Sequence, residues 1–170
     1  MPEQPQGRFR LIRWLFGGLV AVFLVLQLLP FGRPRTNPPV TAEPAWDSPR
    51  TRVLFFRSCA DCHSNETRWP WYSRVAPVSW LVTKDVREGR EHFNISEWNS
   101  PQDDAQEAAE MVQEGEMPPW FYLPTHPEAW YTDAERADLI AGLTATFGSE
   151  DGERGRNRRR KGGDGERDED

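Results

Sequence analysis

The residues Cys59-Ala60-Asp61-Cys62-His63 form a C-x-x-C-H motif, which holds both cysteines and one of the three histidines of the 170-residue chain. Two thiols at this spacing can add across the two vinyl groups of a haem, and a histidine directly after the second thiol can ligate the iron. The motif therefore predicts one covalently bound haem c. Cys59 and Cys62 are the predicted attachment sites, and His63 is the predicted proximal iron ligand.

Other chemistries that use paired cysteines fit less well. A thioredoxin-like dithiol belongs in a βαβ context, and no strand pattern precedes Cys59. Two cysteines exclude an all-cysteine zinc site, and a mixed zinc site would have only His92 and His126 as further histidines. A disulfide between cysteines three residues apart would close a very small, weakly stabilising loop. Covalent haem is therefore the preferred interpretation.

A second axial ligand is expected if the iron carries electrons, and methionine sulfur is a common choice. Met117 lies in the segment Gly-Glu-Met-Pro-Pro-Trp (115–120), where two prolines favour a rigid, extended loop. Met111 falls within a predicted helix, where a packing role is favoured. Met117 is thus the predicted distal ligand, with His126, His92 or a site that is open or water-bound as the alternatives.

The chain contains eight tryptophans, and several of them lie close to the motif in the sequence. Most are expected in the hydrophobic core, where flat neighbours suit a buried macrocycle. Trp69 and Trp71 follow the motif closely and are predicted to lie around the haem. Arg68 is the best-placed cation to pair with a haem propionate.

The pattern of caps and apolar residues predicts an all-α domain. Asp47 or Ser48 can cap a helix that has Pro49 at its first position, and Thr132 with Glu135 forms a capping box. No alternating stretch flanked by hairpin signals appears. Four helices are expected: from Pro49 into the cysteines, about Pro77–Glu91, about Pro101–Glu114, and from Thr132 through Phe147.

An apolar segment near the N-terminus predicts a single membrane anchor over residues 14–32. None of its nineteen residues is charged. The length of a helix of nineteen residues nearly matches the thickness of a hydrocarbon core, ~30 Å. No Ala-x-Ala pattern follows closely, so an uncleaved anchor is favoured over a signal peptide. Only this stretch could span a bilayer, which excludes a multi-pass transporter. The lipid bilayer is therefore a predicted partner through residues 14–32.

The remaining boundaries follow from composition. Residues 1–13 are predicted as a cytoplasmic tail, 33–46 as a proline-rich linker, and 47–148 as the haem-binding domain. Residues 149–170 carry eight acidic and seven basic side chains among glycines, so a disordered tail is expected. Because these charges are mixed in sign, its basic cluster is not interpreted as a nucleic-acid site.

The membrane topology depends on the motif, because the arginine count on the two sides of the anchor is ambiguous. Haem c is attached on the outer side of the bacterial cytoplasmic membrane, as a property of the c-type cytochrome class. The expected location is therefore a single-pass protein of that membrane, with the haem domain facing the periplasm.

The stretch CADCHSNETRWPWYSRVAPVSWLVTKDVREGREHFNISEW, with the later GEMPPWFYLPTHPEA, resembles the small, membrane-anchored bacterial haem-binding domain family. The resemblance covers about residues 47–148. It implies a small c-type-cytochrome-like helical fold, covalent haem at Cys59 and Cys62, His63 as proximal ligand and Met117 as the matching distal candidate. The family is named for its cofactor, so no reaction is implied.

The expected function is single-electron transfer between redox partner proteins. No serine–histidine–acid set and no second metal cluster accompanies the motif, so the chain is not expected to be an enzyme. The main alternative is a haem-based sensor or small-ligand binder with an open or displaceable distal position. A peroxidase would need a distal acid–base group, for which His126 is the candidate. The formal net charge of −6 makes a basic redox partner plausible.

Overall fold

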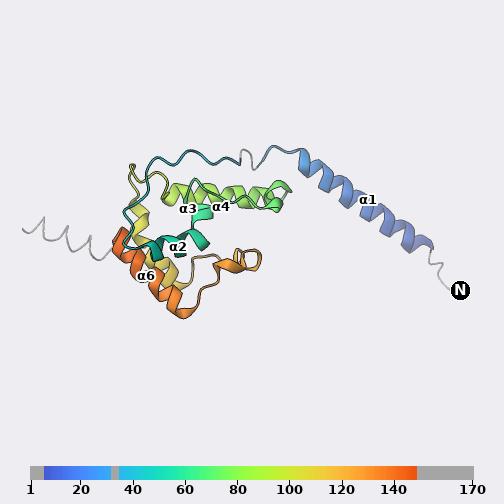
Figure 1. Cartoon of the computed structure of the whole chain (residues 1–170). Coiled ribbons are helices and arrows are strands. Elements are labelled where there is room, and N and C mark those ends of the chain that lie inside the picture. The colour runs from blue at the N-terminus through green and yellow to red at the C-terminus, as the bar shows by residue number, and fades with distance from the viewer. Residues whose placement is uncertain (1–5, 32–34, 149–170) are drawn as a thin grey trace, which may run out of the picture. The chain divides into compact units, whose positions relative to one another are not determined.

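A computed structural model describes residues 6–31 and 35–148, whose regular elements are all helices (Figure 1). No β-strand occurs among these residues, which confirms the all-α prediction. The α-helices are α1 (Gln6–Leu28), α2 (Pro49–Ser58), α3 (Ala60–His63), α4 (Val78–His92), α5 (Ala108–Glu114) and α6 (Asp133–Phe147). The short 3-10 helices are η1 (Trp71–Arg74), η2 (Asp103–Glu107), η3 (Leu123–Thr125) and η4 (Pro127–Ala129). The predicted charged tail, residues 149–170, lies outside the described residues.

Two compact units make up the chain. The first consists of Met1–Thr36 and Trp69–Asp85, and the second of Asn37–Arg68 and Val86–Asp170. Helix α4 contributes its first half to the first unit and its second half to the second unit. The whole C-x-x-C-H motif belongs to the second unit.

The first unit contains the apolar helix α1. Its segment Arg8–Leu28 is long and apolar enough to cross a membrane, since 21 residues rise about 31 Å in an α-helix. This helix begins before the predicted anchor of residues 14–32. Near its end, the Gln27 side chain donates to the carbonyl of Ala76 and accepts from the Ala76 backbone N–H, both at 3.0 Å. The last turn of α1 is thereby bonded to the segment between η1 and α4.

The helix ends of the second unit follow the predicted capping signals. Ser48 accepts a hydrogen bond from the backbone N–H of Thr51 at 3.2 Å, and Pro49 takes the first position of α2. Thr132 and Glu135 form the predicted capping box of α6. The predicted helix over about 101–114 begins as the 3-10 helix η2 and continues as α5, which Gly115 ends in a left-handed conformation with φ 79°.

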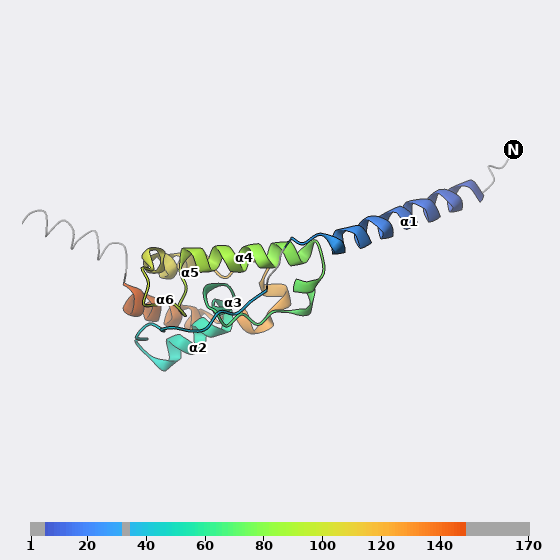
Figure 2. The same ribbon diagram turned by 90° about the horizontal axis from the view of Figure 1, so that it is seen from above.

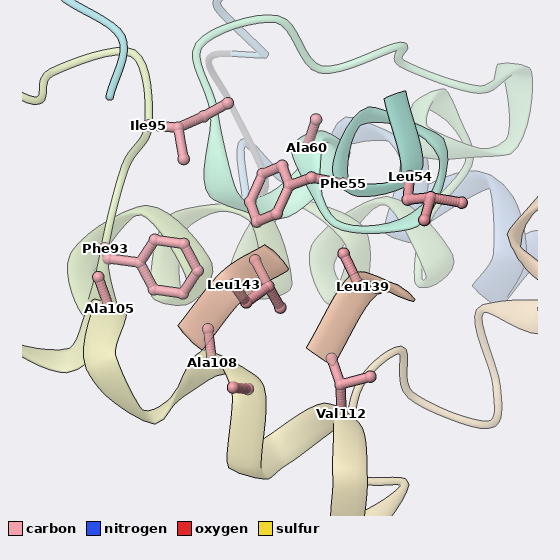
Figure 3. Packing of buried hydrophobic residues seen from close by; sticks show 11 residues of the cluster. Leu54, Phe55, Ala60, Phe93, Ile95, Ala105, Ala108, Val112, Leu139 and Leu143 are labelled. Atoms are coloured by element: carbon pink, nitrogen blue, oxygen red, sulfur yellow. The ribbon is translucent and has the colours of Figure 1, made fainter. Parts of the chain in front are cut away.

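The core of the second unit lies where α6 packs against α2 and α5 (Figure 2). Figure 3 shows Phe55 of α2 pointing between Phe93 and Leu143, with which it shares one buried cluster. Gly142 is required at the α2–α6 crossing, because an added Cβ would lie 2.0 Å from the Thr51 hydroxyl oxygen. Each large apolar side chain buried here contributes about 1.5–3 kcal/mol to folding.

Part of the predicted linker 33–46 is bonded to the second unit. The backbone N–H of Thr41 donates to the carbonyl of Ser96 at 2.8 Å, and Trp98 N–H donates to the carbonyl of Ala42 at 3.1 Å. The Asn37 side chain donates to the carbonyl of Thr67 at 2.9 Å. From Asn37 onward, the chain therefore runs along the surface of the domain.

Candidate functional site

The C-x-x-C-H motif occupies a single turn of chain directly after α2. Cys59 closes α2 by donating its backbone N–H to the carbonyl of Phe55 at 2.8 Å. The N–H groups of Cys62 and His63 then donate back to the carbonyl of Cys59, at 3.1 and 3.0 Å. The two cysteines are not joined by a disulfide. We call residues 59–63 the attachment turn, because it places both thiols and the imidazole on one short helical turn.

His63 is buried and held by the segment that follows α4. Its Nδ1 lies 3.3 Å from the carbonyl oxygen of Phe93, and its ring stacks on the Phe93 ring at 4.1 Å. The backbone N–H of Ile95 donates to the carbonyl of His63 at 2.9 Å. A carbonyl oxygen can only accept, so the proton belongs on Nδ1, and the lone pair of Nε2 is left for a metal.

The protonation state of His63 suits metal ligation. Burial lowers the pKa of its imidazole to about 4, and this effect outweighs the hydrogen bonding to the carbonyls of Phe93 and Gly89. The imidazole is therefore neutral at neutral pH. Neutral imidazole is the form that binds metal ions.

The surroundings of Cys59 favour the protonated form of its thiol. Burial raises its pKa to about 11, against smaller opposing contributions from hydrogen bonds to Ser58 and Tyr131. The Ser58 hydroxyl lies 3.4 Å from the thiol sulfur and also contacts the Tyr131 hydroxyl. The active thiol of a thioredoxin-like protein has a lowered pKa. The environment of Cys59 therefore disfavours dithiol redox chemistry.

Arg68 contacts the attachment turn through Asp61. Its guanidinium donates to the Asp61 carboxylate from Nε at 3.2 Å and from Nη2 at 3.0 Å, and also lies 3.7 Å from Glu128. The guanidinium side chain keeps 56% of its surface exposed. Of the two tryptophans predicted around the haem, Trp69 is half-buried and Trp71 is exposed, and both belong to the first unit.

The four candidates for a second axial ligand lie in different settings of the second unit. Met117 follows the left-handed Gly115, is half-buried, and packs against the core cluster, as Cys59 does. Met111 is half-buried on α5. The Nδ1 of His92 lies 2.8 Å from the exposed carboxylate of Asp104.

His126 is engaged with its own loop. Its ring stacks on the Tyr122 ring at 3.7 Å with an angle of 5° between the planes. Its Nδ1 lies 3.0 Å from the Tyr122 carbonyl and 3.1 Å from the Thr125 hydroxyl. Within the described residues, no group of three or more His, Cys, Asp or Glu side chains that could hold a metal ion is found.

Sequence reasoning missed several residues that shape the attachment turn. Gly89 of α4 approaches it so closely that an added Cβ would lie 2.7 Å from the Cys62 carbonyl oxygen. A glycine inside a helix costs about 1 kcal/mol relative to alanine, so its presence was an available signal of close packing. Phe93, Asp61 and Tyr122 gave no comparable signal, because their partners are distant in the chain.

Comparison with known protein families gives one match. A family model described as a haem-binding domain matches residues 21–145. No curated protein and no solved structure matches the chain. The matched range includes the attachment turn, Gly89, Phe93 and Met117.

Proposed function

The chain belongs to the haem-binding domain family, and from this premise we propose that it is a membrane-tethered protein with one covalently bound haem c that transfers single electrons. The family match shows haem binding. Covalent attachment, electron transfer and the periplasmic location are the proposed parts. A bound haem supplies one-electron chemistry between ferric and ferrous iron.

The residues of the attachment turn fit a covalently bound haem. Cys59 and Cys62 lie on one turn and do not form a disulfide, and two thiols at this spacing can form thioether bonds to the vinyl groups of one haem. His63 is neutral and directs its protonated nitrogen to a backbone carbonyl, which leaves the other nitrogen for iron. This pairing of two unbridged thiols with a buried, oriented imidazole is the observation that carries the proposal.

Met117 is the proposed distal ligand. Its backbone N–H donates to the carbonyl of Met111 at 3.1 Å, which fixes the start of its loop at the end of α5. Pro118 is buried directly after it. Met117 and Cys59 pack against the same core cluster, whereas the Nδ1 of His92 lies 2.8 Å from the exposed carboxylate of Asp104, which favours the thioether over His92.

Large exposed aromatic side chains follow Met117 in the same loop. Trp120 exposes 80% of its surface and Phe121 exposes 52%. A monomeric domain rarely presents such side chains next to each other without a partner. A flat apolar cofactor or a docked redox protein would cover them, and both belong to the proposed function.

The proposed location is the bacterial cytoplasmic membrane, with the N-terminus inside and the second unit in the periplasm. The support is the apolar helix α1, which is long enough to cross a membrane, and the attachment chemistry of haem c, which sets the orientation. Full-length protein should remain in membranes after a high-salt wash and should be degraded by protease added to spheroplasts. Protection of residues 37–148 from that protease would contradict the orientation.

The proposed electron-transfer role is tested by the visible spectrum of the reduced protein with and without carbon monoxide. An unchanged six-coordinate ferrous spectrum is expected, because Met117 occupies the distal position. Rapid formation of a carbon monoxide adduct would contradict this and support a haem-based sensor or small-ligand binder. No catalytic role is proposed.

A further inference from the structure

We propose that Asp61 is a positioning residue of the iron site, which holds the segment 117–126 against the attachment turn through Tyr122. The segment begins with Met117, so this inference rests on the proposed function for its consequence at the iron. The contacts that carry it involve only residues of the second unit.

The Asp61 carboxylate lies in the attachment turn and is the centre of a partly buried hydrogen-bond network. Only 7% of Asp61 is exposed. Its Oδ1 accepts from the backbone N–H of Arg68 at 2.8 Å and from Arg68 Nε at 3.2 Å. Its Oδ2 accepts from Arg68 Nη2 at 3.0 Å and from the Tyr122 hydroxyl at 2.8 Å. A buried carboxylate needs such partners, since charge without them is costly in the protein interior.

The bond from Tyr122 connects two parts of the chain that are far apart in sequence. Asp61 lies between the two cysteines, and Tyr122 lies 61 residues further along. Tyr122 also stacks on His126, so the hydroxyl bond restrains the ring pair as well as one side chain. This hydrogen bond therefore fixes the far end of the loop to the attachment turn.

The near end of the same loop is fixed at α5. Met117 N–H donates to the carbonyl of Met111, and Pro118 is buried. Between the two ends, the N–H of Tyr122 donates to the carbonyl of Pro119 at 3.0 Å, which closes a turn. A short loop with both ends held has little freedom to move the Met117 thioether. Loss of the Asp61–Tyr122 bond should release one end only.

The chain offers a matched control for the charge of Asp61. Glu128 lies 3.7 Å from the same Arg68 guanidinium, whereas the Tyr122 hydroxyl donates to Asp61. Glu128→Gln removes one negative charge close to the Arg68 guanidinium and keeps the Asp61–Tyr122 hydrogen bond. Tyr122→Phe removes that bond and changes no charge. Asp61→Asn removes the charge and leaves one acceptor oxygen for Arg68 and Tyr122, so the charge-assisted bond is lost.

The test measures amide hydrogen exchange of residues 119–126 in the full-length protein, together with the far-red ferric band of methionine–histidine haem. Tyr122→Phe and Asp61→Asn should speed exchange in this segment by about tenfold or more, because a charge-assisted hydrogen bond is lost. Both should weaken the far-red band. Glu128→Gln should leave both readouts at wild-type values.

Wild-type exchange in Tyr122→Phe would overturn the proposal, and this variant remains decisive if Asp61→Asn fails to fold. An equal effect of Glu128→Gln would overturn it too, because charge alone would then be responsible. If the wild-type protein lacks covalent haem or the far-red band, the proposed function fails at that point. The exchange comparison would still decide whether Asp61 holds the loop.

Discussion

The His63 imidazole stacks on the Phe93 ring at 4.1 Å, and the carbonyl oxygen of Phe93 lies 3.3 Å from His63 Nδ1. One residue thus restrains both the plane of the imidazole and its tautomer. The orientation of an iron-ligating histidine is set by such contacts of its second nitrogen.

Phe93→Ala should separate these two restraints, because it removes the ring and keeps the carbonyl. We expect covalent haem to be retained and the free energy of unfolding to fall by about 3–5 kcal/mol, as for other buried phenylalanines. The electron paramagnetic resonance spectrum of the ferric protein should shift as the imidazole plane rotates. Phe56→Ala, at a half-buried position of α2, is the control and should leave that spectrum unchanged. An unshifted spectrum in Phe93→Ala would show that the stack does not orient His63.

Gly89→Ala should damage the attachment turn. In an unobstructed helix this substitution stabilises by about 1 kcal/mol, but here the new Cβ would lie 2.7 Å from the Cys62 carbonyl oxygen. We expect a lower melting temperature and less covalently bound haem per chain. Gly142→Ala creates a similar clash with Thr51 away from the site, and should lower the melting temperature while folded chains keep their haem. A Gly89→Ala protein with full haem content and raised stability would refute the close approach.

Met117→Ala should change the iron without detaching the haem. Loss of the thioether should abolish the far-red charge-transfer band, lower the reduction potential and speed carbon monoxide binding. Met111→Ala should do none of these. Because Met111 is half-buried, its loss should cost less than the ~2–5 kcal/mol of a fully buried side chain. Persistence of the band in Met117→Ala, with its loss in His126→Ala, would assign the ligand to the histidine.

Glu135 should make the stability of the domain depend on pH. The Arg57 guanidinium, 2.6 Å from its carboxylate, lowers the pKa of Glu135 to about 2, with help from hydrogen bonds to Thr132. The folded-state value is below the ordinary 4.5, so the stabilisation is present above pH 4.5 and is lost as the pH falls towards 2. Glu135→Gln should lower the melting temperature at pH 7 and have a smaller effect at pH 3. Asp138→Asn, at an exposed position of the same helix, is the control; an equal loss at both pH values in Glu135→Gln would contradict the linkage.

Local signals in the sequence predicted the helices and their ends. The Ser48 cap with Pro49 and the Thr132–Glu135 capping box occur in the structure, and the third predicted helix ends at Glu114 as expected. Such signals are readable because they depend on residues within one or two turns of each other. The start of the third predicted helix differs, since the chain first forms the 3-10 helix η2.

The surroundings of the attachment turn were less predictable, because they depend on contacts between distant segments. The motif predicts Cys59, Cys62 and His63 as the haem-binding residues, but nothing local indicates that Phe93 stacks on His63. Arg68 was expected to face a propionate, and its guanidinium is bonded to Asp61. More than half of the Arg68 side chain is exposed, which leaves room for a second anionic partner. Pairing with a propionate therefore stays a prediction.

Covalent attachment of haem at Cys59 and Cys62 is the central claim, and the mass of the denatured full-length protein tests it most directly. The account predicts that the wild-type chain is heavier than its sequence by one haem, and keeps this mass after extraction with acidified organic solvent. The double variant Cys59→Ala, Cys62→Ala should have the mass of the bare chain. A wild-type chain that loses its haem to the solvent and returns to the mass of its sequence would contradict the account.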